Sequence, residues 1–114
     1  LTVSKSFDTF FSFGPQLVTP DEIPDVSTLE VSTVLNGRVH AKNVVANMTF
    51  SPAFLVSFLS RVMTLLPGDI ISTGTPPGVG MGIKPEPVYL KKGDVMELWI
   101  EGLGQQRQTV TEDA

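Results

Sequence analysis

The residues best suited to hold a ligand are Thr73, Gly74 and Thr75, which follow a short apolar stretch and precede Pro76. Glycine lets a ligand approach the backbone closely, and the neighbouring hydroxyl and N–H groups are donors that suit a carboxylate or carbonyl oxygen. A turn that merely ends a strand would use the same residue types. The pattern therefore leaves two interpretations open, an anion-holding turn and a plain turn.

A second candidate is Lys5, which begins an alternating segment over residues 5–13. In an extended chain Lys5 shares a face with aromatic residues, so its amine must either reach past them to water or pair with an anionic ligand. Thr9 lies on the same face, about 13 Å from Lys5 along a straight strand. Both can touch one ligand only if the chain bends near Phe7 and Asp8.

The other polar candidates have simpler explanations. His40 is the only histidine, and we expect it to be an exposed residue of a strand. Asp21, Glu22 and Asp25 cluster near prolines, where a solvated turn explains them better than a cation site. No serine has a histidine and an acid as plausible partners, so no catalytic triad is predicted.

Glycines at positions 78, 80 and 82 imitate a phosphate-binding loop. No lysine followed by serine or threonine accompanies them, and no helix follows, so a nucleotide- or carbohydrate-binding function would rest on this feature alone. The many glycines and prolines of residues 73–87 predict a surface loop over a site or a sheet edge.

A β-hairpin is the clearest predicted element. Residues 28–35 alternate between apolar and polar side chains, Asn36-Gly37 supplies the positive φ angles of a tight turn, and 38–45 returns as the second strand. Further turns at Gly68-Asp69 and Gly93-Asp94 are each expected to lead into a strand, and a last strand is expected after Gly104.

One main helix is predicted over about 51–65. Ser51 is a good N-cap, Pro52 suits the first helical position, and apolar residues then recur at helical spacing as far as Pro67-Gly68. We expect this helix to pack on the sheet. The fold class is therefore α+β with β dominant, a mixed or antiparallel sheet with one main helix in a single domain.

Composition limits the classes of function. The chain has 114 residues, 41% hydrophobic and 18% charged, which is typical of a globular domain. The net charge of −4 and the dispersed basic residues argue against a nucleic-acid partner. No apolar run reaches the roughly 18–20 residues that span a bilayer, so no membrane association is predicted. The lack of cysteine suits a reducing compartment, and we expect a cytoplasmic protein.

Four blocks of the sequence resemble the fumarylacetoacetate hydrolase family. They are KSFDTFFSFGPQLVTPDEIPD, then NGR, then NMTFSPAFLVSFLSRVMTLLPGDIISTGTPPGVG, then LKKGDVMELWIEGLG, and together they run from Lys5 to Gly104. The likeness is greatest to the branch of acylpyruvases, oxaloacetate decarboxylases and 2-hydroxyhepta-2,4-diene-1,7-dioate isomerases, enzymes that include members of aromatic catabolism. Because the chain opens without a methionine, as if inside an element, we expect it to be the C-terminal part of a longer protein.

The resemblance implies a β-rich roll that forms a homodimer and a divalent metal, Mg²⁺ or Mn²⁺, that binds a small 2-oxo acid and stabilises an enolate. It matches Lys5 to a catalytic lysine that contacts the substrate. It matches Thr75, with Gly74 beside it, to the residue that holds the substrate carboxylate, and Thr9 to a threonine near the metal.

The same resemblance implies that the metal ligands and a His–Glu dyad lie upstream of Leu1, so this chain holds no metal site of its own and is expected to be inactive alone. Many relatives carry Gln at position 41 and Thr at position 45, where this chain has Ala41 and Val45. Two hypotheses follow. One is a metal-dependent hydrolase, decarboxylase or isomerase of 2-oxo acids, and the other is a catalytically inactive binding or assembly module with the same fold.

Overall fold

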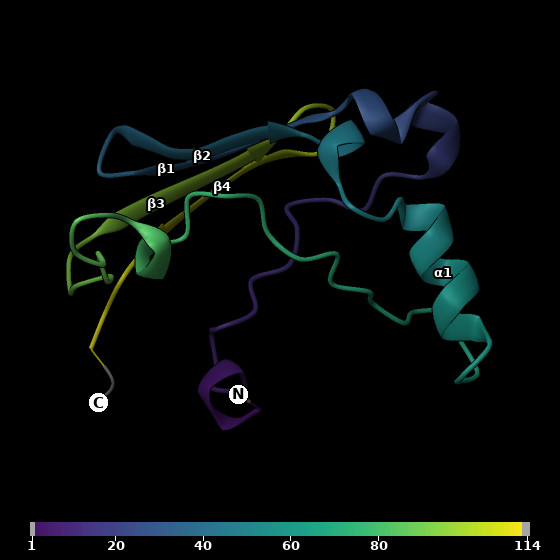
Figure 1. Ribbon diagram of the computed structural model, residues 1–114, viewed down its shortest axis with the longest axis horizontal. Helices are drawn as coiled ribbons and strands as arrows, with labels where there is room; N and C mark the ends of the chain where they lie inside the picture. The colour runs from purple at the N-terminus through teal and green to yellow at the C-terminus, as the bar shows by residue number, and fades with distance from the viewer. Residues whose placement is uncertain (1, 113–114) are drawn as a thin grey trace.

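A four-stranded antiparallel sheet forms the centre of the computed structural model, which describes residues 2–112 (Figure 1). The strand order is β2-β1-β3-β4, so two hairpins lie side by side through β1 and β3. The sheet does not close into a barrel. The strands are β1 (Glu30–Leu35), β2 (Arg38–Val44), β3 (Val95–Ile100) and β4 (Gly104–Thr109).

The predicted hairpin is confirmed. Asn36 and Gly37 have φ angles of 49° and 78°, as the tight turn between β1 and β2 requires. The pairing is irregular at one point, because Thr33 pairs with Ala41 while Val34 pairs with Val39. His40 is therefore the extra residue of a β-bulge.

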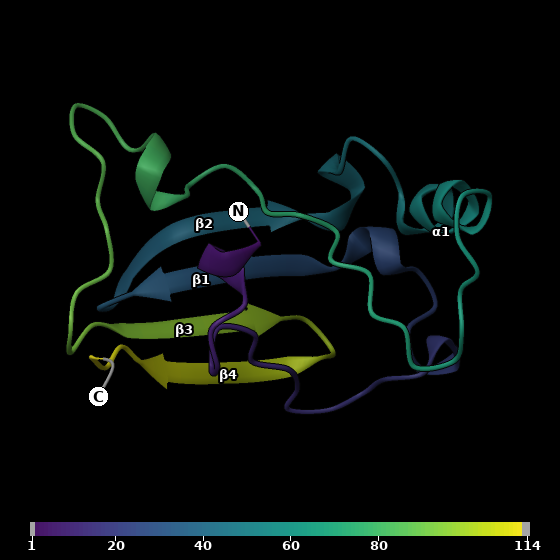
Figure 2. The ribbon, with the colours of Figure 1, turned by 90° about the horizontal axis from the view of Figure 1, so that it is seen from below.

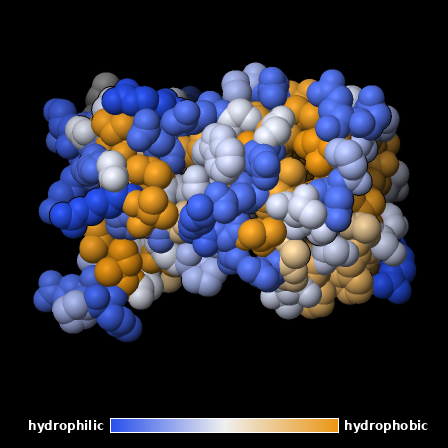
Figure 3. Space-filling model, turned by 90° about the horizontal axis from the view of Figure 1, so that it is seen from above, coloured by the Kyte–Doolittle hydropathy of each residue, from blue (hydrophilic) through white to orange (hydrophobic). Residues whose placement is uncertain are grey.

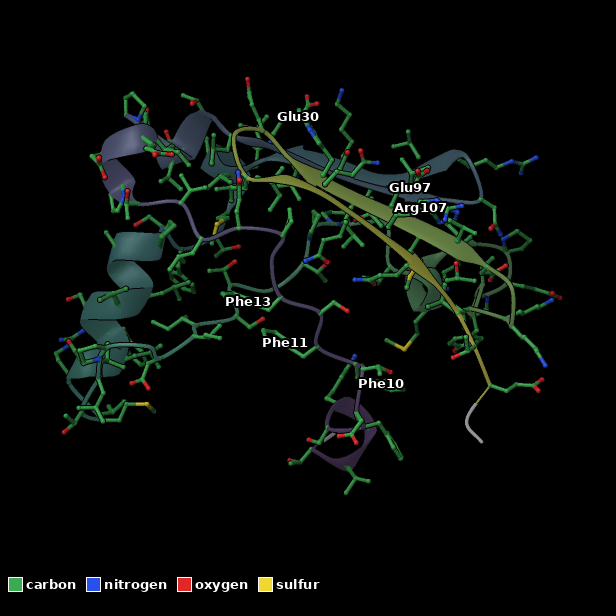
Figure 4. All side chains as sticks on the ribbon, turned by 180° about the vertical axis from the view of Figure 1, so that it is seen from behind. Phe10, Phe11, Phe13, Glu30, Glu97 and Arg107 are labelled. Carbon is green, nitrogen blue, oxygen red and sulfur yellow. The ribbon has the colours of Figure 1, made fainter. Side chains whose placement is uncertain are left out.

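The two faces of the sheet differ in polarity. On the lower face of Figure 1, β1 and β3 carry mostly apolar residues that lie opposite one another in the register, namely Val31, Thr33, Leu35, Met96, Leu98 and Ile100. The other face carries ion pairs, including Lys42 with Glu30 at 2.9 Å and Arg107 with Glu97 at 3.9 Å. Figure 4 shows Glu30, Glu97 and Arg107 at the sheet and Phe10, Phe11 and Phe13 beneath it. The lower face is the one that needs a cover.

The main helix, α1 (Pro52–Ser60), is shorter than the predicted 51–65. Its beginning is as expected, since the Ser51 hydroxyl accepts a hydrogen bond from the Phe54 N–H at 3.2 Å. It ends early because the Ser60 hydroxyl donates to the Ser57 carbonyl and the N–H of Arg61 bonds the Phe58 carbonyl, three residues back.

The expected packing of this helix on the sheet is wrong. In Figures 1 and 2, α1 lies beyond one end of the strands. Phe54 of α1 instead stacks on Phe50 before it and Phe58 after it, with ring centroids 4.9 and 6.3 Å apart.

Two predicted strands are absent from the described residues. Residues 5–13 pair with no strand of the described sheet. Lys5 ends the 3-10 turn η1 (Val3–Lys5), and a turn and bends follow it. The turn at Gly68-Asp69 leads into irregular chain rather than a strand, whereas the turn at Gly93-Asp94 leads into β3 as predicted. The remaining 3-10 turns are η2 (Pro20–Glu22), η3 (Val26–Thr28), η4 (Val45–Asn47) and η5 (Gly80–Gly82).

Little of the chain is buried. Leu29, at 8% exposure, is the only hydrophobic residue in the buried class among those described. The accessible surface is 9287 Å² for a mass of 12.3 kDa. A folded monomer of that mass exposes about 6,100 Å². Figure 3 shows apolar groups on both sides of a hydrophilic centre on the upper face. Roughly a third of the surface is in excess of what a self-contained domain exposes.

A polar contact joins the hairpin turn to β3. Asp94 accepts hydrogen bonds from the Asn36 side-chain amide at 2.9 Å and from the Lys91 N–H at 2.8 Å, while the Asn36 side-chain oxygen accepts from the Val95 N–H at 2.9 Å. The bond from the Asn36 side chain, and then the Lys91 N–H, lower the pKa of Asp94 below its ordinary value of 3.8.

We therefore predict that Asp94→Ala lowers the urea midpoint of unfolding at pH 7. Because the folded pKa is below the unfolded one, ionised Asp94 stabilises the fold above about pH 4, and this contribution is lost as the pH falls through the lowered pKa. The difference between parent and variant should shrink in acid. Glu86→Ala, at an exposed acid, is the control. A difference that is equally large at pH 7 and pH 3 would contradict the prediction.

Candidate active site

A pocket of about 230 Å³ lies on the lower face of the sheet, between the strands and the glycine-rich loop. The strands supply Thr33 and Leu35 from β1, His40 and Ala41 from β2, and Met96 from β3. The loop that covers them supplies Thr75, Gly78, Val79, Gly80, Val88 and Leu90. Of the four predicted site residues, Thr75 lines this pocket.

The β-bulge explains why two consecutive residues of β2 line the same pocket. In a regular strand His40 and Ala41 would point to opposite faces. Because His40 is the extra residue, Ala41 pairs with Thr33, and His40 and Ala41 both line the pocket. Sequence alternation led us to expect an exposed His40, but the structure leaves it only partly exposed. No local signal marks the bulge, since Val39, His40, Ala41 and Lys42 keep alternating between apolar and polar types.

The loop fits the sheet because Gly78 has no side chain. Its φ is +120°, and a Cβ added there would collide with the carbonyl oxygen of His40. Gly80 is equally restricted, since a Cβ would collide with the Val88 carbonyl, and the Val88 N–H donates to the Gly80 carbonyl at 2.9 Å. These glycines bring the loop against the bulge, and no role in phosphate binding is needed to explain them.

Lys5, Thr9 and Gly74 do not line the pocket. Gly74 adjoins Thr75 and has a φ of +90°, with open space where a Cβ would lie. Lys5 ends η1, which lies below the sheet in Figure 1, on the side where the chain from α1 to η5 crosses beneath the strands. In Figure 2 the same turn lies in front of β1 and β2. Lys5 and the pocket are thus on one side of the sheet.

Thr9 marks a sharp bend in the N-terminal segment. Its φ is 69°, a left-handed value that β-branched residues rarely adopt, and the Phe10 N–H donates to the Phe7 carbonyl at 3.1 Å. The chain therefore turns at residues 7–10, next to the place where a shared ligand of Lys5 and Thr9 would require it. Strained backbone of this kind is concentrated at functional sites.

Lys5 is exposed and takes part in no ion pair within residues 2–112. Its charge is therefore not neutralised by a carboxylate of the described chain. An anionic ligand that reached it would not have to displace an internal partner.

The acidic cluster near the prolines serves the fold. Asp25 caps η3, where its carboxylate accepts hydrogen bonds from the Ser27 N–H at 2.9 Å and the Ser27 hydroxyl at 2.6 Å. The Ser27 side chain, and then its N–H, lower the pKa of Asp25. Within residues 2–112 no three His, Cys, Asp or Glu side chains are grouped so that they could hold a metal ion. The residues present therefore do not fit a metal by themselves.

Comparison with known proteins identifies the family. A model described as the C-terminal region of fumarylacetoacetate (FAA) hydrolase matches residues 1–111. The chain belongs to this family. No helix in the described part of the chain is long and apolar enough to cross a membrane.

Solved members of the family share the fold. The fumarylacetoacetate hydrolase of Exiguobacterium antarcticum is 42% identical with a TM-score of 0.91, over 96% of this chain and 39% of that one. The 5-carboxymethyl-2-hydroxymuconate delta-isomerase of Mycobacterium smegmatis is 37% identical with a TM-score of 0.82, over 97% and 40%. The maleylpyruvate hydrolase of Sphingobium sp. SYK-6, solved with manganese and pyruvate, is 33% identical with a TM-score of 0.83, over 95% and 38%. The chain thus spans about two fifths of these relatives.

We predict that Gly78→Ala detaches the loop from the bulge. The variant should lose about 1–3 kcal/mol of unfolding free energy, because the new methyl group meets the His40 carbonyl in a left-handed backbone conformation. Urea denaturation and the rate of proteolysis within residues 73–87 measure the two effects.

Gly68→Ala is the matched control, since Gly68 also has a positive φ, of +93°, but its Cβ would meet nothing within 4 Å. Equal losses in the two variants would show that only the backbone angle matters and that the close approach to the bulge does not.

Proposed function

We propose that the complete protein is a metal-dependent hydrolase, decarboxylase or isomerase of small 2-oxo acids, and that this chain supplies the groups that hold the substrate. The observation that carries the proposal is Thr75 at the wall of a pocket, on the side of the sheet where Lys5 lies, in a chain that belongs to this family. The solved relatives include hydrolases and an isomerase, and one of the hydrolases was solved with manganese and pyruvate.

In this proposal the metal, Mg²⁺ or Mn²⁺, is bound by residues upstream of Leu1, because the described residues include no suitable group of ligands. This chain is then the C-terminal part of one catalytic domain that acts as a homodimer. No step is assigned to the metal from the present residues.

Lys5 is proposed to neutralise the negative charge of the bound substrate. An ammonium group without an internal carboxylate partner can offer its full charge to the substrate oxygen, and the interaction strengthens as negative charge develops during the reaction. Thr9, at the bend that follows, is proposed to support this end of the site.

Thr75 is proposed to bind the substrate carboxylate. Its hydroxyl can donate to one carboxylate oxygen, and the positive φ of Gly74 leaves the adjoining backbone open to the ligand. A hydrogen bond to a charged group contributes about 1.5–3 kcal/mol. This amount is sufficient to fix the orientation of a small acid.

We predict that Lys5→Ala in the complete protein lowers kcat by about 10²–10³, because a cation that stabilises developing charge is removed. The fold should be unaffected, since Lys5 is exposed. Hydrolysis of acylpyruvates and decarboxylation of oxaloacetate, each with Mg²⁺ and with Mn²⁺, are the assays.

Lys84→Ala is the control for Lys5, as another exposed lysine without an ion pair in the described chain. An unchanged rate in Lys5→Ala would show that Lys5 is only a solvent-exposed surface residue. If the parent protein turned over no 2-oxo acid, the catalytically inactive binding module would be the better description.

For Thr75 we predict an effect on binding. Thr75→Val removes the hydroxyl with little change of shape and should raise KM by about 10- to 100-fold, the equivalent of a lost hydrogen bond to a charged group. Thr75→Ser should restore most of the affinity. Steady-state kinetics with one 2-oxo acid would test this, and equal KM values for the Val and Ser variants would exclude a role for the hydroxyl.

A further inference from the structure

The pocket that Thr75 lines is mostly apolar. Besides Thr75, its polar lining consists of Thr33 and His40, and every other lining residue is apolar or glycine. The apolar lining side chains are Leu35, Ala41, Val79, Val88, Leu90 and Met96. Within residues 2–112, no lysine, arginine or carboxylate contributes to this wall. The pocket therefore suits a group that is uncharged.

A second carboxylate would be badly placed in this pocket. A carboxylate that leaves water needs a cation or several hydrogen-bond donors in compensation, and here the only polar lining residues are Thr33, His40 and Thr75. An apolar group gains free energy in the same place, since each buried methylene is worth about fourfold in affinity.

The size of the pocket suits a small group. Its volume is about 230 Å³, and it opens to solvent, with Val79 and Val88 of its lining each 44% exposed. A short alkyl chain or a single ring fills such a space. Ala41 contributes to this room, because the bulge aims position 41 into the pocket and alanine extends only one carbon from the backbone.

We propose that this pocket binds the uncharged, apolar acyl or alkyl end of the substrate, and that the protein prefers 2-oxo acids with an apolar tail to dicarboxylic ones. The proposal rests on the proposed function, because Thr75 is taken to hold the carboxylate end. Ala41, which lies opposite Thr33 at the bulge, then determines specificity by setting the space.

The test compares two ligands that differ only at the far end. 2-Oxooctanoate ends in a methyl group, and 2-oxooctanedioate ends in a carboxylate. Calorimetric titration of the complete protein in buffer with Mn²⁺ should give a Kd for 2-oxooctanoate that is lower by on the order of 100-fold. Pyruvate, which has no tail, serves as the reference for the carboxylate end. Equal affinity for the two long acids, or tighter binding of the dicarboxylate, would overturn the proposal.

A variant tests the location. Ala41→Leu fills the pocket and should weaken 2-oxooctanoate at least tenfold while leaving pyruvate within about twofold. Val39→Leu is the matched control, since Val39 lies on the same strand, is 62% exposed and does not line the pocket. A loss of 2-oxooctanoate affinity in the control as large as in Ala41→Leu would also overturn the proposal.

The binding measurements distinguish a failure of the proposed function from a failure of the apolar pocket. If neither pyruvate nor 2-oxooctanoate bound, the proposed function and this inference would both be wrong. If pyruvate and 2-oxooctanoate bound with equal affinity, the 2-oxo acid function would stand and the apolar pocket would have no part in it.

Discussion

The close approach of Gly78 to the carbonyl of His40 is the contact on which the site depends. It brings a long irregular loop against the sheet at the one place where the strand pairing is interrupted. Thr75 lies three residues before this contact, so its position at the pocket follows from it. The bulge and the glycine act together. The loop meets the backbone of the extra residue His40, and a residue larger than glycine at position 78 would hold the loop away from the sheet.

The rest of the molecule covers this contact between loop and sheet only in part. The lower face of the sheet is apolar, yet the exposed surface of the chain is about half again that of a self-contained monomer of its mass. The N-terminal phenylalanines beneath the sheet are more than half exposed, at 63% for Phe10 and Phe11 and 64% for Phe13. Such an arrangement is expected where a site is built on a sheet face and further protein completes its walls.

Local signals in the sequence were sufficient for part of this fold. Asn36-Gly37 fixes its own turn geometry, and Ser51 caps its own helix, so both were predictable from a few adjacent residues. The strand expected over 5–13 is absent, because alternation shows only that a segment could pair, and pairing needs an edge far away in the sequence. The end of α1 involves local hydrogen bonds of Ser60 and Arg61 that apolar periodicity does not register.

The candidate site was likewise predictable only in part. Thr75 and its turn could be selected because glycine and threonine before proline have a local meaning, whereas the role of His40 depends on a bulge that only the paired strand creates.

Charge is unevenly distributed around the site. Among the described residues the pocket wall contains no cation, so within this chain the charge that balances a bound carboxylate comes from outside the pocket. In the described chain Lys5 is on the same side of the sheet and carries no carboxylate partner. A ligand with one charged end and one neutral end would match this arrangement, with Thr75 at the boundary between the two regions. A ligand charged at both ends would leave one charge facing Leu35 and Met96 without compensation.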